Sequence, residues 1–137
     1  MAYSNFYAKF LDTLKTVGAS CSTLWRYYPS RIYLAAAFLF QALSFWQAFW
    51  IKNNLSSELI VLRYRIDFGA SLIGEPSLIM NYPLISLGVL ILNSILAVSL
   101  SSRSDKKIFI HLFLASASAF SFFMSLYLLS VFLINFR

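Results

Sequence analysis

The apolar residues of this chain are gathered into long blocks that contain no charged residue. The clearest block covers residues 32–51, and a helix of about 20 residues crosses the roughly 30 Å hydrocarbon core of a bilayer. A second block, residues 84–100, follows Pro83, which suits a first helical turn because no N–H partner is needed there. A third block, residues 108–136, is interrupted only by His111. The pattern predicts three transmembrane helices, over residues 32–51, 83–101 and 108–134.

The segment before the first block has apolar residues at helical spacing instead of a continuous run. Its apolar positions are Tyr3, Phe6, Tyr7, Phe10, Leu11, Leu14 and Val17. Lys9, Asp12 and Lys15 fall on the opposite face. We therefore expect an amphipathic helix over residues 3–18 that lies in the headgroup plane of the membrane. Packing of the same face on a partner, or on loops of this chain, is an equal alternative, because amphipathicity alone does not separate lipid from protein.

The connector between the first two spans, residues 52–82, contains a segment in which apolar and polar residues alternate. From Leu62 to Phe68 every second residue is apolar. This period of two, with aromatic and β-branched members, predicts a half-buried strand. Glycine and proline at positions 69, 74 and 76 then predict a turn before the second span.

A single strand must find a partner for its backbone hydrogen-bonding groups. The upstream apolar stretch 59–62 is one candidate within the chain. Another protein is the second candidate, through strand addition on the outer face of the membrane. A third interpretation is a short re-entrant segment or surface cap over the helix ends. For a bound partner we expect the contact residues to be Arg63, Tyr64, Arg65, Asp67, Gly69 and Gly74.

The connector and the start of the second span resemble a recurring feature of a known group of proteins. The run from Leu62 to Gly74, together with Pro83-Leu84-Ile85 and Asn93, is similar to small three-span membrane proteins of reduced-genome, candidate-phylum bacteria. The resemblance covers about residues 62–96 and rests on apolar and glycine positions. It implies a bacterial cytoplasmic-membrane protein with the same three-span layout, and it implies no activity.

This chain departs from the pattern of that group at four positions. Arg63, Arg65 and Asp67 stand where the group has His, Asn and Tyr. Ser71 stands where an acidic residue is common, so the resemblance carries over no carboxylate role to this chain.

The basic residues indicate how the chain is oriented in the membrane, because cytoplasmic segments carry an excess of Lys and Arg. With the N-terminus in the cytoplasm, seven basic residues lie on the cytoplasmic side and four on the other. The short segment 102–107, a predicted cytoplasmic turn, holds three of the seven. We expect a multi-pass protein of the cytoplasmic (inner) membrane, with the N-terminus in the cytoplasm and the C-terminus outside.

Composition supports a membrane protein and offers little chemistry. Of the 137 residues, 60% are hydrophobic and 12% charged, against about 45–50% and about 25% in soluble domains. The net charge of +6 comes from residues dispersed at the ends of the apolar blocks, so we expect no nucleic-acid binding. His111 has no second ligand nearby in sequence, and no Gly-x-Ser-x-Gly motif is present. We therefore expect no enzymatic activity, catalytic residue, metal or cofactor.

Small and polar residues form stripes along each predicted span. The polar members are Gln41, Ser44, Asn93, Ser121 and Ser125. Small residues let helix backbones approach, and buried amides form hydrogen bonds across helices. We interpret the stripes as helix-packing surfaces. A polar pathway through Gln41 and Asn93 is the alternative, but no Asp, Glu, Lys or Arg lies within a predicted span.

The fold we expect is an all-α integral membrane domain. It has three transmembrane helices, an N-terminal interfacial helix and a short extracytoplasmic β-like connector. The first functional hypothesis is a non-catalytic subunit or assembly factor that contacts lipid and a protein partner in the membrane. The second is a homo-oligomeric transport or permeation element, in which copies join through the small-residue stripes.

Overall fold

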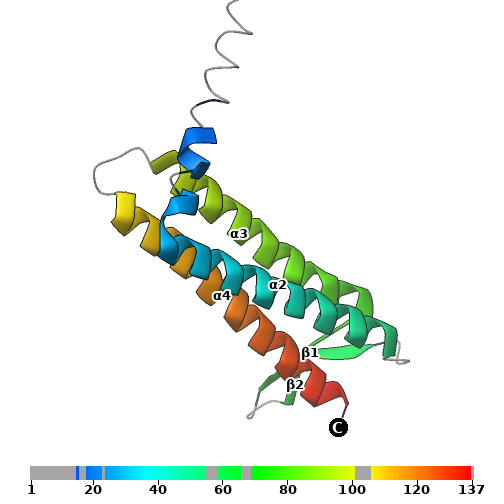
Figure 1. The fold of residues 1–137 in the computed structure, drawn as a ribbon. Coiled ribbons are helices and arrows are strands. Elements are labelled where there is room, and N and C mark those ends of the chain that lie inside the picture. The colour runs from blue at the N-terminus through cyan, green and yellow to red at the C-terminus, as the bar shows by residue number, and fades with distance from the viewer. Residues whose placement is uncertain are drawn as a thin grey trace, which may run out of the picture.

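The computed structural model describes residues 15, 18–22, 24–54, 59–65, 69–100 and 106–136, with the backbone alone for 63–65, 69–71 and 106 (Figure 1). Three long helices form a bundle, and a two-stranded hairpin lies at one end of it. The helices are α2 (Tyr28–Asn54), α3 (Asn81–Leu100) and α4 (Lys106–Asn135). A short 3₁₀ helix, η1 (Pro76–Met80), leads directly into α3.

Three helices in the described part of the chain are long and apolar enough to cross a membrane. They are Tyr28–Asn54, the continuous helical stretch Pro76–Leu100, and Lys107–Asn135. The predicted spans 32–51, 83–101 and 108–134 overlap these helices, although the first begins four residues and the second seven residues earlier than expected. Large apolar side chains cover the outside of the bundle, among them Leu39, Leu92 and Phe123. Such a surface is suited to lipid and unsuited to water.

The helices alternate in direction, as three clusters of buried residues show. Near the end where α4 begins, Leu24 packs with Ala97 and with Ile110 and Leu114. Ala37, Leu90 and Ala117 form the middle cluster. At the hairpin end, Ala48 and Ile51 lie with Ile79, Leu128 and Val131. The α2 and α4 helices therefore run parallel, and α3 runs antiparallel to both (Figure 1).

The hairpin joins β1 (Ile60–Arg65) to β2 (Gly69–Gly74) in an antiparallel pair. The register begins at Ile60 opposite Gly74 and ends at Arg65 opposite Gly69. Two irregularities interrupt it, one between Val61 and Arg63 and one between Arg63 and Tyr64. Each is a bulge that leaves one residue without a direct partner and increases the local twist.

The connector differs from one open candidate for strand pairing and from one expectation about a turn. The partner of the strand is the downstream segment 69–74, whereas the stretch 59–62 belongs largely to β1 itself. Positions 69 and 74, expected to form a turn, are the two ends of β2. Glycine serves here for close approach, because a Cβ on Gly74 would lie 2.9 Å from Leu62 Cδ1. Glycine in a strand marks such an approach as readily as it marks a turn.

Some predicted elements lie wholly or mostly outside the described residues. The amphipathic helix over 3–18 is described only at Lys15 and Gly18, which are exposed. Of the predicted turn 102–107, only Lys106 and Lys107 are described, and they begin α4.

Candidate functional site

The C-terminal end of α4 holds the first strand of the hairpin. The side-chain amide of Asn135 donates to the Val61 carbonyl at 2.8 Å, and its Oδ1 accepts from the Val61 N–H at 2.9 Å. Asn135 also donates to the Val131 carbonyl of its own helix at 2.8 Å, which fixes its orientation. A single side chain therefore satisfies both backbone groups of Val61, as a neighbouring strand would.

The bulge in β1 supplies a second connection to α4. Leu62 has no direct partner in β2, so its carbonyl is available to another donor. The Tyr127 hydroxyl donates to that carbonyl at 2.8 Å. Because two side chains of one helix contact consecutive residues of β1, the strand is fixed in position as well as in orientation.

Apolar packing beneath the hairpin completes the attachment. Ile60 is 1% exposed and Leu62 is 4% exposed, and both join the core cluster at the ends of the helices. Gly74 allows this packing, because its bare Cα faces the ends of the Leu62 and Leu78 side chains. Burial of an Ile or Leu side chain contributes about 1.5–3 kcal/mol. The hairpin is thus part of the folded domain.

The Asn135 contact also determines how the two edges of the hairpin differ. In an antiparallel pair, opposite residues either bond to each other or point their backbone groups away from each other. Val61 points its groups at Asn135, so Val61 and Ile73 form a pair of the second kind. The Ile73 N–H and C=O therefore point to the outer edge of β2. Among the described residues, no group is hydrogen-bonded to Ile73 on that side.

Exposed apolar side chains accompany this outer edge. Ile73 is 54% exposed and Leu72 is 46% exposed, and Leu59 and Leu78 beside the hairpin are also exposed. An edge strand with exposed apolar residues readily pairs with a strand of another protein. The arrangement provides a backbone donor and acceptor together with an apolar contact surface.

The structure brings five of the six predicted partner-contact residues onto the hairpin. Arg63, Tyr64 and Arg65 are in β1, whereas Gly69 and Gly74 are in β2. The sixth, Asp67, lies outside the described residues. The sequence did not indicate the edge residue Ile73 or the role of Asn135, because both follow from the register of the hairpin.

The predicted polar stripe of α2 faces the interior of the bundle. Gln41 is buried and donates from Nε2 to the Pro83 carbonyl of α3 at 2.7 Å. Ser44 is also buried. Among the described residues, Gln41 Oε1 and Ser44 Oγ have no hydrogen-bond partner. The Gln41 contact is an amide bond across helices of the kind that stabilises membrane bundles.

The polar residues of α3 and α4 lie in or beside the same interior. Ser121 accepts from Ser86 of α3 at 3.3 Å, and both are fully buried. Ser125 donates to Gln47 Oε1 of α2 at 3.3 Å. Asn93 is half-buried and donates to the Val89 carbonyl within its own helix at 2.9 Å.

The small-residue stripes of the three helices are buried by helix packing within one chain. Ala37 and Ala48 of α2, Ala97 of α3 and Ala117 of α4 are each at most 1% exposed. A small-residue face that is already buried is not available to a second copy. Assembly of copies would have to use other surfaces of this bundle.

A polar cluster at the opposite end of the bundle was not predicted. His111 Nε2 lies 2.6 Å from the Tyr27 hydroxyl, and Nδ1 lies 3.0 Å from the Tyr33 hydroxyl. Both rings stand edge-on to the imidazole. Two tyrosine hydroxyls therefore occupy both ring nitrogens of His111. Hydroxyl groups donate or accept, so this pairing holds for either tautomer of histidine.

Candidate metal ligands and charged side chains are sparse among the described residues. No group of three or more His, Cys, Asp or Glu residues suited to binding a metal ion occurs in the described ranges. Within them, Arg31 and Lys52 of α2 and Lys107 of α4 are exposed near helix ends. The middle of the described bundle contains no charged side chain.

Comparison with known proteins adds no further assignment. No family model matches the chain, and no curated protein or solved structure is significantly similar to it. The resemblance to three-span proteins of reduced-genome bacteria therefore stays a prediction.

Proposed function

We propose that this protein is a non-catalytic subunit or assembly factor of a membrane complex, and that it binds its partner through the outer edge of β2. The observation that carries the proposal is the asymmetry of the hairpin. Asn135 occupies the β1 edge at Val61, and the backbone groups of Ile73 in β2 point outward. Strand addition at such an edge combines backbone hydrogen bonds with contacts to alternate side chains.

The rest of the molecule supports a binding role over a catalytic or transport role. The hairpin is preorganised by Asn135 and Tyr127, which lowers the entropic cost of binding. Exposed Leu72 and Ile73 add apolar area beside the edge. A solute pathway usually has an ionisable residue within the membrane, and no charged residue lies in the middle of the described bundle.

We further propose that the hairpin lies on the outer face of the cytoplasmic membrane. The bias of seven basic residues to four supports a cytoplasmic N-terminus. The hairpin lies at the opposite end of α2 from its start at Tyr28. A partner would then be an extracytoplasmic or membrane protein with a strand available for pairing.

Affinity purification from native membranes in mild detergent, with crosslinking and mass spectrometry, tests the proposal. The decisive variant is Ile73→Pro, because proline removes the outward N–H without removing a bond between β1 and β2. We expect a stoichiometric companion with the natural chain and its loss with Ile73→Pro. The combined variant Arg63→Ala, Arg65→Ala, Asp67→Ala tests whether the charged residues of the hairpin add to specificity.

The matched control is Ile73→Val, which keeps the N–H and the β-branched side chain. It should retain the companion at the natural level, and thermal unfolding in detergent should show that both variants remain folded. Recovery of this chain alone from crosslinked native membranes would contradict the proposal. Recovery of an equal amount of companion with Ile73→Pro would reject the β2 edge as the binding site.

A further inference from the structure

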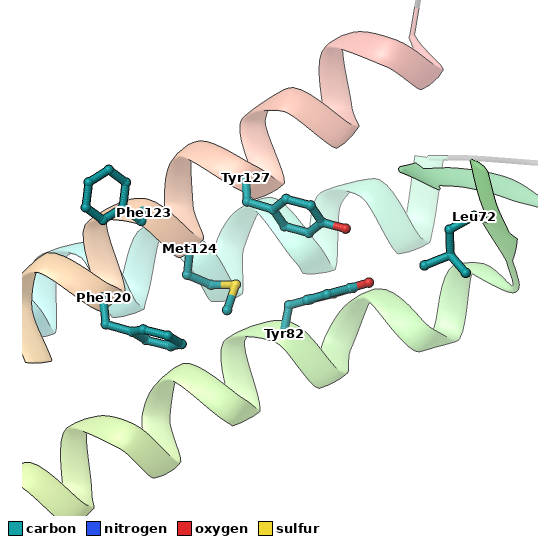
Figure 2. Close-up of a pocket in the computed structure, with 6 residues that line it drawn as sticks. All are labelled: Leu72, Tyr82, Phe120, Phe123, Met124 and Tyr127. Carbon is teal, nitrogen blue, oxygen red and sulfur yellow. The ribbon is translucent and has the colours of Figure 1, made fainter. Parts of the chain in front are cut away.

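A groove opens on the side of the bundle between α3, α4 and the hairpin. It has a volume of about 560 Å³ and is lined by Leu72, Tyr82, Phe120, Phe123, Met124 and Tyr127 (Figure 2). The volume falls within the range of about 300–1,000 Å³ that is typical of small-ligand sites. Its lining comes largely from two membrane-spanning helices, so its surroundings in the membrane are lipid.

The groove is polar at one end and apolar at the other. The hydroxyl groups of Tyr82 and Tyr127 both point toward Leu72 at the hairpin end, whereas Phe120 and Met124 line the opposite part (Figure 2). The two tyrosine rings are in contact, with centroids 4.9 Å apart. Tyr127 donates to the Leu62 carbonyl. No described residue is hydrogen-bonded to the Tyr82 hydroxyl, which leaves it available to a ligand.

The mouth of the groove adjoins a basic strand. Leu72 lines the mouth, and its register partner in β1 is Arg63. The two strands contain Arg63 and Arg65 and no acidic residue. Asp67 between the strands and Glu75 directly after β2 balance these charges in the hairpin as a whole, so the positive charge is confined to β1. Positive charge at a membrane surface attracts anionic headgroups by about 1 kcal/mol per basic residue.

We propose that this groove binds one molecule of an anionic glycerophospholipid. One acyl chain lies along Phe120 and Met124, the ester region accepts a hydrogen bond from the Tyr82 hydroxyl, and the phosphate lies toward the basic β1 strand. The groove is thus apolar, then hydrogen-bonding, then basic along its length. A phospholipid has its acyl chain, ester region and phosphate in the same order. Leu72 borders both this groove and the outer edge of β2, but the groove is otherwise formed by α3 and α4 and does not depend on the proposed protein partner.

The size of the groove favours a lipid over a transmembrane helix of a partner. A helix is about 10–12 Å across with a pitch of 5.4 Å, so one turn occupies roughly 500 Å³. The groove therefore has room for a single helical turn, far less than a helix that spans the bilayer. An acyl chain, by contrast, is narrow enough to follow the groove along α4.

Photocrosslinking in vesicles tests this proposal with the full chain. The protein is reconstituted into phosphatidylcholine vesicles that contain a small fraction of phosphatidylglycerol with a diazirine in one acyl chain. We expect labelling concentrated on peptides that contain Phe120 to Tyr127 and Tyr82. Unlabelled phosphatidylglycerol should compete for that labelling, whereas added phosphatidylcholine should not.

Three variants assign the effect to the groove. Met124→Trp fills the apolar part and should remove most of the labelling, whereas Leu126→Trp, at an exposed position two residues away on α4, should leave it unchanged. Tyr82→Phe removes one hydrogen bond and should weaken competition by roughly 2- to 10-fold. Arg63→Ala should reduce the preference for phosphatidylglycerol by about fivefold.

Uniform labelling on all faces of the bundle would overturn the proposal, because it would indicate bulk lipid only. If unlabelled phosphatidylcholine competes for the labelling as well as phosphatidylglycerol does, the proposed preference for an anionic headgroup is wrong. If Met124→Trp does not fold, Tyr82→Phe remains informative, because it leaves the side chain the same shape. An unchanged competition curve with Tyr82→Phe would contradict the hydrogen bond to the lipid.

Discussion

The two ends of the bundle are held together by different kinds of contact. At the hairpin end, the side chains of Asn135 and Tyr127 on α4 bond to backbone groups of Val61 and Leu62. At the other end, the hydrogen bonds to α4 join side chains, where two tyrosine hydroxyls meet His111. Both ends therefore connect segments far apart in the sequence through α4.

The difference explains why the hairpin end is the better candidate for binding. Contacts to backbone groups fix the direction in which a strand presents its remaining donors and acceptors. Side-chain contacts around a histidine hold two helices together without exposing any backbone edge. The hairpin end thus combines a fixed strand with an outer edge, whereas the described residues of the histidine end include no strand edge.

The largest expected effect is at Asn135, because its amide alone pairs both backbone groups of Val61. Asn135→Leu keeps the approximate volume and leaves these two groups unpaired. We expect the free energy of unfolding to fall by about 1–3 kcal/mol. Denaturant titration in mixed micelles measures this change. An unchanged free energy of unfolding would show that Asn135 does not hold the hairpin.

A smaller effect is expected at the histidine end. Tyr27→Phe or Tyr33→Phe removes one hydroxyl from a half-buried imidazole, and either change should lower the free energy of unfolding by about 1 kcal/mol. The same titration measures it, with Tyr28→Phe as a control because Tyr28 is exposed. If these variants lose more stability than Asn135→Leu, the comparison between the two ends is reversed.

Two glycines provide a matched pair of substitutions. A Cβ at Gly74 would lie 2.9 Å from Leu62 and 3.0 Å from Leu78, whereas a Cβ at Gly88 of α3 meets nothing within 4 Å. Both close contacts are with flexible leucine tips, so Gly74→Ala should cost about 1 kcal/mol of stability. Gly88→Ala should be neutral or stabilise α3 by up to about 1 kcal/mol. Equal thermal stability of the two variants would contradict close packing of the hairpin.

The smallest effect is expected in the middle of the bundle. Ser86 donates to Ser121 at 3.3 Å, a long hydrogen bond between neutral groups. A double-mutant cycle with Ser86→Ala and Ser121→Ala should give a coupling energy of about 0.6 kcal/mol. A coupling energy larger than the stability lost in Asn135→Leu would show that the main polar connection lies at the bundle centre.

Much of the fold followed from local patterns in the sequence. Continuous apolar runs predicted the three helices, because a bilayer of fixed thickness demands long uncharged segments. Spacings of three and four placed Gln41, Ser44 and Ser121 on interior faces, and each is buried in the structure. Alternation predicted a strand that includes Leu62, and this residue is buried in β1.

The candidate site was harder to predict from the sequence, because it depends on long-range contacts. Asn135 and Val61 are 74 positions apart in sequence, and Tyr27 and His111 are 84 apart. No periodicity links such pairs. Gly69 and Gly74 indicated a turn in the local pattern, whereas the role of Gly74 depends on how closely β2 approaches Leu62. The register, which identifies Ile73 as the outward residue, emerges only from the folded hairpin.

Backbone amide hydrogen exchange in the detergent-solubilised protein tests the central claim most directly, since it reports which hairpin edge is occupied. We expect slow exchange at Val61, whose N–H is bonded to Asn135, and fast exchange at Ile73. Asn135→Leu should accelerate hydrogen exchange at the Val61 amide without changing the exchange rate at Ile73. Slow exchange at Ile73 in the isolated chain, or fast exchange at Val61, would contradict the assignment of the outer edge of β2 as the open one.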